Sequence, residues 1–279
     1  MLIMLGCGIV LVAVLVPGIR WSALPFRTNP PLAEPTPVEV GRRYTWYCSI
    51  LLLGGLVAGI GTIGVGGRLA MRLLAVTSDD TAQGAITEAD EIVGDITLGG
   101  TIGFVLFNGI IGGVLATAIY LIVRRFLPTG RWGGVVYGLG LLAVFGATVD
   151  PLRRDNPDFD IVGPGWLSVL TFTALAIAFG VAVQGWTARL STWLPLPATD
   201  RRVAVRYLPV AAAAVVGYLL TIVFAVVGIV VVAVTRLWRP VACLVRSDAW
   251  VRGGRILLGA VVLVCLPILL VSVVDIISR

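Results

Sequence analysis

The densest group of ionisable side chains in the sequence is SDDTAQGAITEADEIVGD, at residues 78–95. If Thr87 caps a short helix, as the order Thr-Glu-Ala-Asp favours, then Glu88, Glu91 and Asp95 share one helical face at i, i+3 and i+7. Three carboxylates on one face can hold a hard cation such as Ca²⁺ or Mg²⁺ when carbonyls or water complete its shell. A cation site is therefore one interpretation of this stretch.

Two other interpretations compete with the cation site. Arg68 and Arg72, one helical turn apart, can reach the same acids and neutralise them through ion pairs in a solvated loop. The spacing also departs from an EF-hand loop, which alternates oxygen ligands around a central glycine and ends in glutamate. We favour an ordinary outer loop with salt bridges, and a surface for docking a partner is the third alternative.

A second acidic segment, at 150–164, alternates four aspartates with Arg153 and Arg154 and contains an Asn-Pro turn signal. We expect it to form a compact cap at the same end of the molecule and to touch the first acidic segment. Nothing in the sequence encloses these aspartates enough to shift a pKa, which argues against a catalytic carboxylate pair.

Few polar side chains fall inside the long apolar stretches, and Asn108 and Gln184 are the two amides among them. A buried amide needs a partner or water, whereas a threonine can bond to its own helix backbone. We expect each amide to join neighbouring helices, and the alternative is a polar pathway for a solute. No Asp, Glu or Arg occupies the centre of an expected span, which weakens the case for an ion-coupled carrier.

The residue types that are missing exclude several functions. The chain has no lysine and no histidine, so its 21 basic residues are all arginine. Lysine is required for a retinal or pyridoxal Schiff base, and histidine for HExxH proteases, Ser-His hydrolases and the usual b-type haem ligation. The four cysteines lie in or beside apolar segments without CxxC spacing. We expect no catalytic residue, no metal ligand and no cofactor.

These side chains belong to a chain with the composition of an integral membrane protein. Of its 279 residues, 58% are hydrophobic and 13% are charged, and its mean hydropathy is +1.00. A bilayer core takes about 20 apolar residues per helix. The sequence therefore predicts an all-α, polytopic transmembrane helix bundle of about seven spans, near 2–19, 45–67, 96–123, 132–149, 165–187, 207–235 and 256–277.

The chain divides into three parts. Residues 1–19 lack a basic n-region and a clean cleavage site, so we expect an uncleaved membrane anchor helix rather than a signal peptide. Residues 20–43 are a proline-rich cytoplasmic linker, expected to be extended. Residues 44–279 form the helix bundle, with acidic outer loops at 68–95 and 150–164.

The arginines predict the topology, because arginine-rich loops remain in the cytoplasm. With the 20–43 loop inside, eleven arginines lie inside, whereas the two acidic loops together hold four arginines and ten carboxylates. The N-terminus is then outside and the C-terminus is cytoplasmic. One loop conflicts with this rule, because 236–255 carries five arginines and lies outside if 207–235 crosses the membrane once. We favour that single crossing over a re-entrant excursion, because the segment is too short to cross twice.

Pairs of glycines four residues apart recur in the second, third and fourth spans: Gly55/Gly59, Gly99/Gly103, Gly109/Gly113 and Gly134/Gly138. In lipid, small residues on one face let helix backbones approach closely. We therefore expect these three spans to form the tight core. The alternative is that the glycines let helices kink or slide during transport.

Three strings, GGRLAMRLLAVTSDD, TEADEIVGDITLGGT and DFDIVGPGWLSV, resemble uncharacterised multi-pass membrane proteins of high-GC actinobacteria, over roughly residues 60–190. The resemblance implies a location in the bacterial plasma membrane. It supplies no activity and no functional residue.

Two functions fit these observations. The leading interpretation is a non-catalytic scaffold or subunit of a membrane assembly, with membrane lipids, other membrane subunits or copies of itself as partners. The alternative is a transporter or channel for a small neutral or weakly charged solute, with its path near Asn108. The arginines lie beside apolar runs, where they meet lipid headgroups rather than nucleic acid. A membrane enzyme would need the outer carboxylates to converge around a metal or pyrophosphate.

Overall fold

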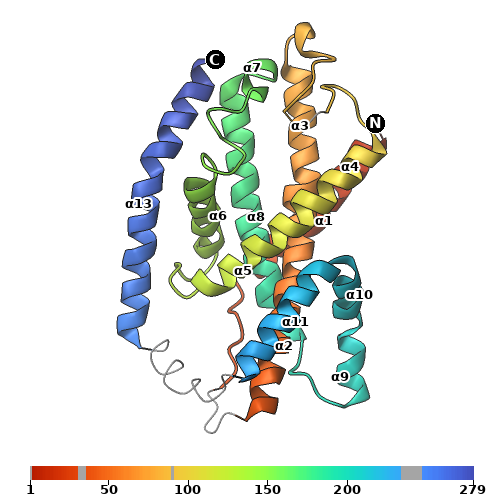
Figure 1. The fold of residues 1–279 in the computed structure, drawn as a ribbon, viewed down its shortest axis with the longest axis vertical. Coiled ribbons are helices and arrows are strands. Elements are labelled where there is room, and N and C mark those ends of the chain that lie inside the picture. Colours follow the sequence, from red (N-terminus) through yellow and green to blue (C-terminus); the bar gives the residue numbers. More distant parts are fainter. Residues whose placement is uncertain (1, 31–35, 89–90, 234–246) are drawn as a thin grey trace.

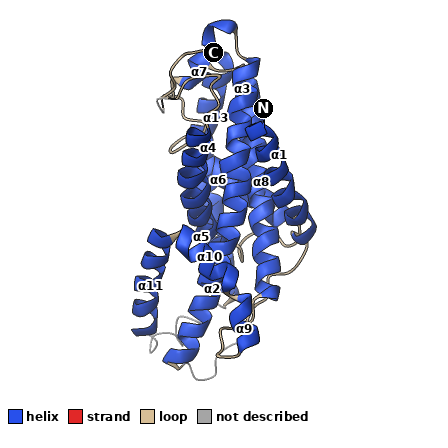
Figure 2. Cartoon of the chain, turned by 90° about the vertical axis from the view of Figure 1, so that its right-hand side faces the viewer, coloured by secondary structure: helices blue, strands red, loops and turns tan. Residues whose placement is uncertain are grey.

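A computed structural model of the chain describes residues 2–30, 36–88, 91–233 and 247–279. In these ranges the chain is helical, without a named strand, and only an isolated bridge joins Ile86 to Ile92 (Figure 2). The all-α prediction is confirmed. The elements are α1 (Leu2–Trp21), α2 (Pro37–Ala58), η1 (Gly59–Gly64), α3 (Val65–Thr77), η2 (Asp80–Ala82), α4 (Leu98–Phe104), η3 (Val105–Gly112), α5 (Gly113–Val123), α6 (Trp132–Phe145), α7 (Asp158–Ile161), α8 (Gly165–Trp193), α9 (Arg201–Arg206), α10 (Leu208–Val216), α11 (Tyr218–Ala233) and α13 (Asp248–Ser278).

Five helical segments of the described residues are long and apolar enough to cross a membrane: α1, α2–η1–α3, α4–η3–α5, α8 and α13. Helix α6 is apolar but has 14 residues, and α10 with α11 qualifies only as a pair bent by 110°. The count is therefore five, or six with the bent pair, where the sequence predicted about seven. Hydropathy overestimated the number of spans, because it reports how apolar a segment is and not which path the segment takes through the bundle.

The second span is longer than predicted, because α2, η1 and α3 form one continuous helix of 41 residues, Pro37–Thr77. Proline is tolerated at the first helical position, and the Thr36 hydroxyl caps the helix by accepting a hydrogen bond from the Glu39 N–H. The helix thus begins inside the predicted linker, of which residues 31–35 lie outside the described ranges. Its far end includes Arg68 and Arg72, which the predicted outer loop contained.

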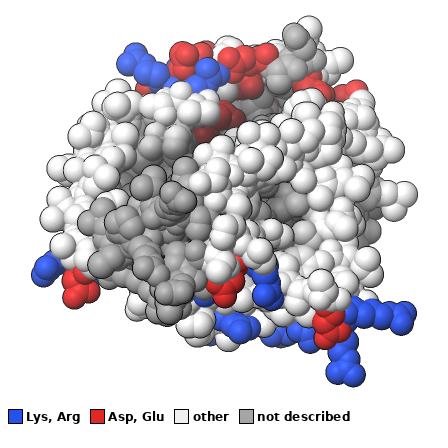
Figure 3. Space-filling view, turned by 60° about the horizontal axis from the view of Figure 1, so that its bottom comes forward, with Lys and Arg blue, Asp and Glu red and all other residues white. Residues whose placement is uncertain are grey.

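Charged side chains gather at two opposite edges of the molecule, with uncharged residues between them (Figure 3). We call one end of the bundle the acidic end, because it carries residues 78–88 and 91–97, the 146–157 loop and α7. The other, the arginine end, carries residues 22–30 and the loops 124–131 and 194–200. Two charged rims around an apolar band are typical of a protein whose band faces lipid.

The segment 208–233 enters the bundle from the arginine end and returns to it (Figure 1). At its bend Gly217 lies against Leu52, deep in α2, and further along the chain Gly228 lies against Tyr44, nearer the start of α2. The second half, α11, therefore runs back toward the arginine end. This path is that of a re-entrant segment and differs from the single straight crossing that the sequence predicted. Length does not forbid a re-entrant path, because an excursion that turns back partway needs fewer residues than two crossings.

Helix α13 carries the C-terminus to the acidic end (Figure 1). There Arg279 forms ion pairs with Asp160, at 3.0 Å, and with Asp275, at 2.9 Å. Helix α1 begins at the same end, because the five long helical segments and α6 each run from one end of the bundle to the other, whereas 208–233 returns to the end from which it came (Figure 1). The sequence predicted termini on opposite sides of a membrane, and the side that each terminus faces stays a prediction.

The start of α13 lies at the arginine end, where Gly254 packs against the ring of Phe126 in the 124–131 loop. Arg252 and Arg255 therefore join the other arginines, while residues 236–246 of that loop lie outside the described ranges. For residues 247–255, the arginines of this loop no longer conflict with the other arginine-rich loops, because they lie at the same end of the bundle.

Glycine brings the second and third spans together. Gly55 and Gly59 face Gly109 and Gly113 so closely that a Cβ on Gly59 would lie 2.1 Å from the Gly109 carbonyl oxygen. Both helices are π-helical here, in η1 and η3. We call this contact the glycine crossing. It agrees with the expectation that small residues bring these helices together.

The fourth span packs elsewhere. Gly134 and Gly138 of α6 face Gly180 of α8, again with backbone against backbone. The predicted tight core of spans two to four is thus divided between two helix pairs. Gly99 and Gly103 take part in neither, since a Cβ on either would meet nothing within 4 Å.

Cysteine labelling in sealed vesicles tests the placement of the C-terminus. With the native cysteines replaced, Ser278→Cys and Thr81→Cys should react with an impermeant maleimide from the same side, because both are exposed at the acidic end. Thr129→Cys, exposed at the arginine end, should react only from the other side. If Ser278→Cys is labelled together with Thr129→Cys instead, then 208–233 crosses the membrane and the fold described here is incorrect.

Candidate functional site

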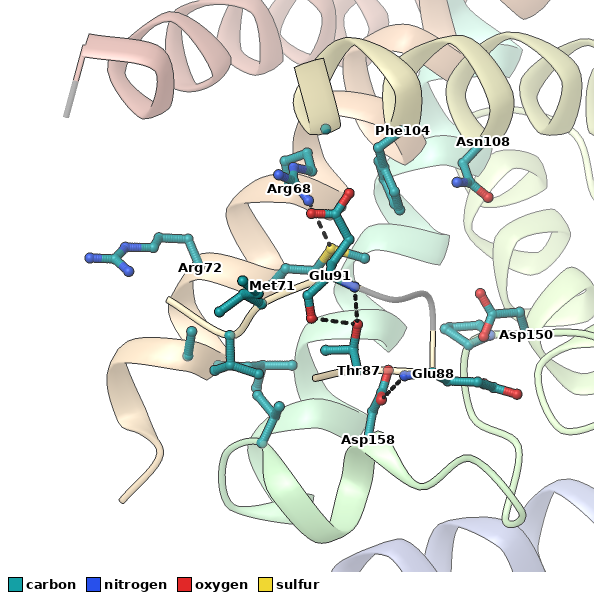
Figure 4. A pocket seen from close by; sticks show the side chains of 18 of the residues that line it. Arg68, Met71, Arg72, Thr87, Glu88, Glu91, Phe104, Asn108, Asp150 and Asp158 are labelled. Atoms are coloured by element: carbon teal, nitrogen blue, oxygen red, sulfur yellow. Dashed lines mark hydrogen bonds between the residues drawn. The ribbon is translucent and has the colours of Figure 1, made fainter. Parts of the chain in front are cut away.

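A cavity of about 940 Å³ lies at the acidic end, between α3, α4–η3, the start of α8 and the two acidic loops (Figure 4). Its volume falls within the roughly 300–1,000 Å³ of ordinary small-molecule sites. Charged residues of α3 and the loops line one part of it, and aromatic, amide and glycine residues of the helices line another. The lining residues that matter for function are Arg68, Met71, Arg72, Glu88, Glu91, Asp95, Gly99, Gly103, Phe104, Phe107, Asn108, Asp150, Arg153, Asp158, Ser168 and Phe172.

The cavity reaches well into the third span. Asn108 lies ten residues after Leu98, the first residue of α4, which is about 15 Å along a helix. The next residue, Gly109, belongs to the glycine crossing, and among the described residues that line the cavity none comes from α5. The glycine crossing thus closes the cavity toward the arginine end.

Arg68 is the buried charge of the cavity. It lies nine residues before α3 ends at Thr77, about 14 Å along the helix from that end. Arg68 is 8% exposed, its Nη1 lies 3.9 Å from Met71 Sδ, and its guanidinium carbon lies 5.9 Å from the centre of the Phe104 ring. No carboxylate in the described part of the chain forms an ion pair with it.

Arg72, one turn further along α3, makes a single long contact, 3.4 Å from its Nη1 to the Gly94 carbonyl. Its side chain points away from Arg68 (Figure 4). The predicted ion pairs between these two arginines and the acidic cluster are therefore not found within the described residues. The prediction failed because both arginines lie on a helix and not in the loop.

The two acidic loops are joined to each other. Arg153 Nη2 lies 2.5 Å and 2.7 Å from the carboxylate oxygens of Glu88, and the Glu88 N–H donates to the Asp158 carboxylate at 2.7 Å. The contact expected between the two loops is thus present. The arginine that neutralises Glu88 comes from the second loop rather than from α3.

The helix predicted over Glu88, Glu91 and Asp95 is not formed. The chain reverses direction there instead, between Gly84 and Gly94, which adopt positive φ angles of 85° and 90°. The three carboxylates therefore do not share a helical face. Among the described residues, which do not include Asp90, no group of three His, Cys, Asp or Glu side chains is placed to hold a metal ion. The shared helical face from which the cation site was inferred is thus not formed.

Asp150 opens onto the cavity and its side chain is exposed, but the two acidic loops bring many protein atoms around its carboxyl. This desolvation raises the pKa of its carboxyl, Arg153 opposes the shift, and the negative charges of Glu88 and Asp158 add to it. The side chain of Asp150 is not enclosed, in keeping with the sequence, but the two acidic loops lie close enough to its carboxyl to raise its pKa, which the sequence did not indicate.

Ser168 lines the cavity from α8. It is fully buried, and its Oγ has no hydrogen-bond partner within the described residues. A buried polar group without a partner costs about 1–3 kcal/mol.

The two amides singled out in the sequence differ in role. Gln184 is buried at the arginine end, where its Nε2 donates to the Ser22 carbonyl at 2.6 Å and to the Gly130 carbonyl at 2.7 Å. This amide therefore joins α8 to two loops, where we expected it to join neighbouring helices. Asn108 is exposed and makes no hydrogen bond within the described part of the chain, so it borders the cavity instead of joining two helices.

Sequence reasoning did not single out Asp150, Arg153 or Ser168 as site residues. A signal for Arg153 was present, since an arginine in the second acidic loop is a natural partner for an acid of the first. Ser168 has no such signal, because a serine in a span usually bonds to its own helix backbone.

Comparison with protein-family models, with curated proteins and with solved structures gave no significant match. The chemistry of the cavity is therefore the basis for assigning a function.

The raised pKa of Asp150 predicts that stability depends on pH. Its proton is held more tightly in the folded chain, so the contribution to stability is complete below its ordinary pKa of 3.8 and is lost as the pH rises through the raised value. Asp150→Asn removes the charge and nearly keeps the shape. Near neutral pH it should therefore melt at a higher temperature than the wild type, and the difference should shrink as the pH falls toward the ordinary pKa.

Scanning fluorimetry of the solubilised protein across this pH range measures the effect. Asp155→Asn, an exposed aspartate of the same loop, is the matched control and should melt close to the wild type. A lower melting temperature for Asp150→Asn near neutral pH would show that Arg153 stabilises the charged form, contrary to the desolvation account.

Proposed function

We propose that the protein binds a small solute in the cavity at its acidic end. The observation that carries this proposal is the cavity itself, about 940 Å³ within a helix bundle and ending beside Asn108. A scaffold that acts by helix packing gains nothing from such a space, since its stability comes from close contact between helices. The cavity therefore favours the solute-binding alternative over the scaffold that the sequence suggested first.

We infer further that the solute is carried across the membrane and that this structure is open to the acidic end. The glycine crossing closes the other side, which argues against an open channel. Both helices of the crossing contain π-helical turns, η1 and η3, and such turns often mark functional sites within longer helices. A change in these turns would rotate the residues beyond them and let the crossing open.

The proposed location is a bacterial plasma membrane, in keeping with the resemblance of the chain to actinobacterial membrane proteins. The arginine end is expected to face the cytoplasm, because arginine-rich loops resist translocation. The cavity and both termini then face outward, so the solute enters from outside. We expect no covalent chemistry at the site, and the solute to leave unchanged.

Accessibility of Asn108 tests the proposal. In a cysteine-free background, Asn108→Cys should react with a charged methanethiosulfonate added from the side of the acidic loops, because the cavity admits water to this depth. Thr117→Cys, fully buried on α5 beyond the glycine crossing, is the control and should not react from that side. A silent Asn108→Cys in a folded protein would mean that the cavity is closed, and the proposed function would fail.

A further inference from the structure

The charge of Arg68 is the feature of the cavity that most needs a partner. A guanidinium carries five N–H donors, and the described contacts of Arg68 are to a sulfur atom and an aromatic face. Its nitrogens are not among the described buried atoms that are cut off from both solvent and partners. Arg68 thus presents free donors to the cavity, at a depth where an unpaired charge is costly.

The acids that line the cavity do not neutralise Arg68. Glu88 is held by Arg153, and Asp158 accepts the Glu88 N–H. Glu91 points toward Arg68 in Figure 4 but forms no ion pair with it within the described residues. All of these acids come from the loops or from α7.

Besides Arg68, the Glu91 carboxylate has a second neighbour, which is the N-terminal turn of α4. Its carboxylate lies beside Gly100, where an added Cβ would be 2.9 Å from Glu91 Oε1. This is the first turn of α4, and the N-terminus of a helix favours negative charge. Glu91 is therefore placed to compete with an incoming anion for Arg68 rather than to satisfy Arg68 permanently.

The wall near Arg68 is apolar and roomy. Phe104 packs under the guanidinium, and Phe107 and Phe172 line the same cavity. Gly99 and Gly103 border it without meeting any other helix, so their missing side chains leave space. The glycine pair that plays no part in helix packing thus widens the cavity beside the aromatic rings.

Two further polar groups line the cavity. Ser168 Oγ is buried without a partner, and the amide of Asn108 makes no hydrogen bond within the described residues. The exposed amide of Asn108 can bond to a polar atom of a bound molecule, such as the second oxygen of an acid or a ring substituent, whereas Ser168 Oγ is covered by protein atoms and would do so only after these shift.

We propose that the cavity binds an organic anion whose acidic group pairs with Arg68 and whose apolar body lies against Phe104, Phe107 and Phe172. The inference rests on the proposed solute-binding function and defines the class of its solute. Two sources share this chemistry: a small aromatic acid from water and a long-chain acid from the outer leaflet. The experiment separates them by its choice of probe.

Isothermal titration calorimetry on the protein in lipid nanodiscs, with empty nanodiscs subtracted, tests the inference with two matched pairs of probes. Naphthoate with naphthamide represents the aromatic source, and decanoate with decanol represents the leaflet source. At least one acid should bind, and its uncharged partner should bind at least about tenfold more weakly, as expected for the loss of a charge-assisted hydrogen bond.

Variants then assign the binding to Arg68. Arg68→Gln should weaken binding of the acid about tenfold or more and leave that of the uncharged probe unchanged. Arg68→Lys keeps the charge and should restore part of the affinity. Glu91→Gln should tighten binding of the acid, because it removes the competing carboxylate. Arg154→Gln is the matched control, since Arg154 is an exposed arginine of the acidic end that does not line the cavity, and its affinity should stay within about twofold of the wild type.

The results separate this inference from the function on which it rests. If the uncharged probes bind as well as the acids, or if Arg68→Gln binds the acid like the wild type, the organic-anion inference is overturned while a solute-binding cavity remains. If no probe binds although Asn108→Cys reacts with the charged reagent, the inference also fails, and the cavity takes a different class of solute. If Asn108→Cys is unreactive as well, the proposed function itself fails.

Discussion

The approach of two helix backbones at Gly59, Gly109 and Gly113 is the constraint on which the rest of the structure depends. Lipid gives helices no hydrophobic reason to associate, so their attraction comes from close contact, which only small residues permit. On the acidic side of this crossing, Gly99 and Gly103 meet no other helix, and the space beside them is the cavity. The same residue type therefore closes the bundle at one level and leaves it open at another.

Arginine also has two uses in this chain. At the arginine end its side chains meet partners: Arg206 Nη1 lies 3.1 Å from the Trp193 carbonyl, and the Arg124 guanidinium lies 3.6 Å from the centre of the Phe26 ring. Arg68 differs, because it lies inside the bundle and its donors face a cavity. A chain without lysine or histidine has guanidinium as its only basic side chain, and the planar donors of guanidinium can pair with both oxygens of an acid.

The sequence predicts those features of the fold that depend on neighbouring residues in the chain. It does not predict features that depend on the route of the chain through the bundle. Hydropathy fixes the all-α class, and glycine spacing identifies Gly55/Gly59 and Gly109/Gly113 as a contact, because the required small side chains are visible in the sequence. The re-entrant path of 208–233 is not visible, since it has the composition of a span. The acidic loop was misjudged because two glycines with positive φ reverse the chain where a capping pattern favoured a helix. Asn108 was recognised as unusual, but its cavity depends on neighbours that lie far away in the sequence.

The most direct test of this account is the thermal stability of Gly59→Ala against Gly112→Ala. A methyl group on Gly59 meets backbone atoms of the third span, whereas one on Gly112, in the same π-helical turn as Gly109, meets nothing within 4 Å. Gly59→Ala should therefore lower the free energy of unfolding by about 1–3 kcal/mol or more. Gly112→Ala should leave it unchanged or raise it by up to about 1 kcal/mol through helix propensity. Equal stabilities for the two variants would contradict the glycine crossing. They would also contradict the inference that this crossing closes the cavity toward the arginine end.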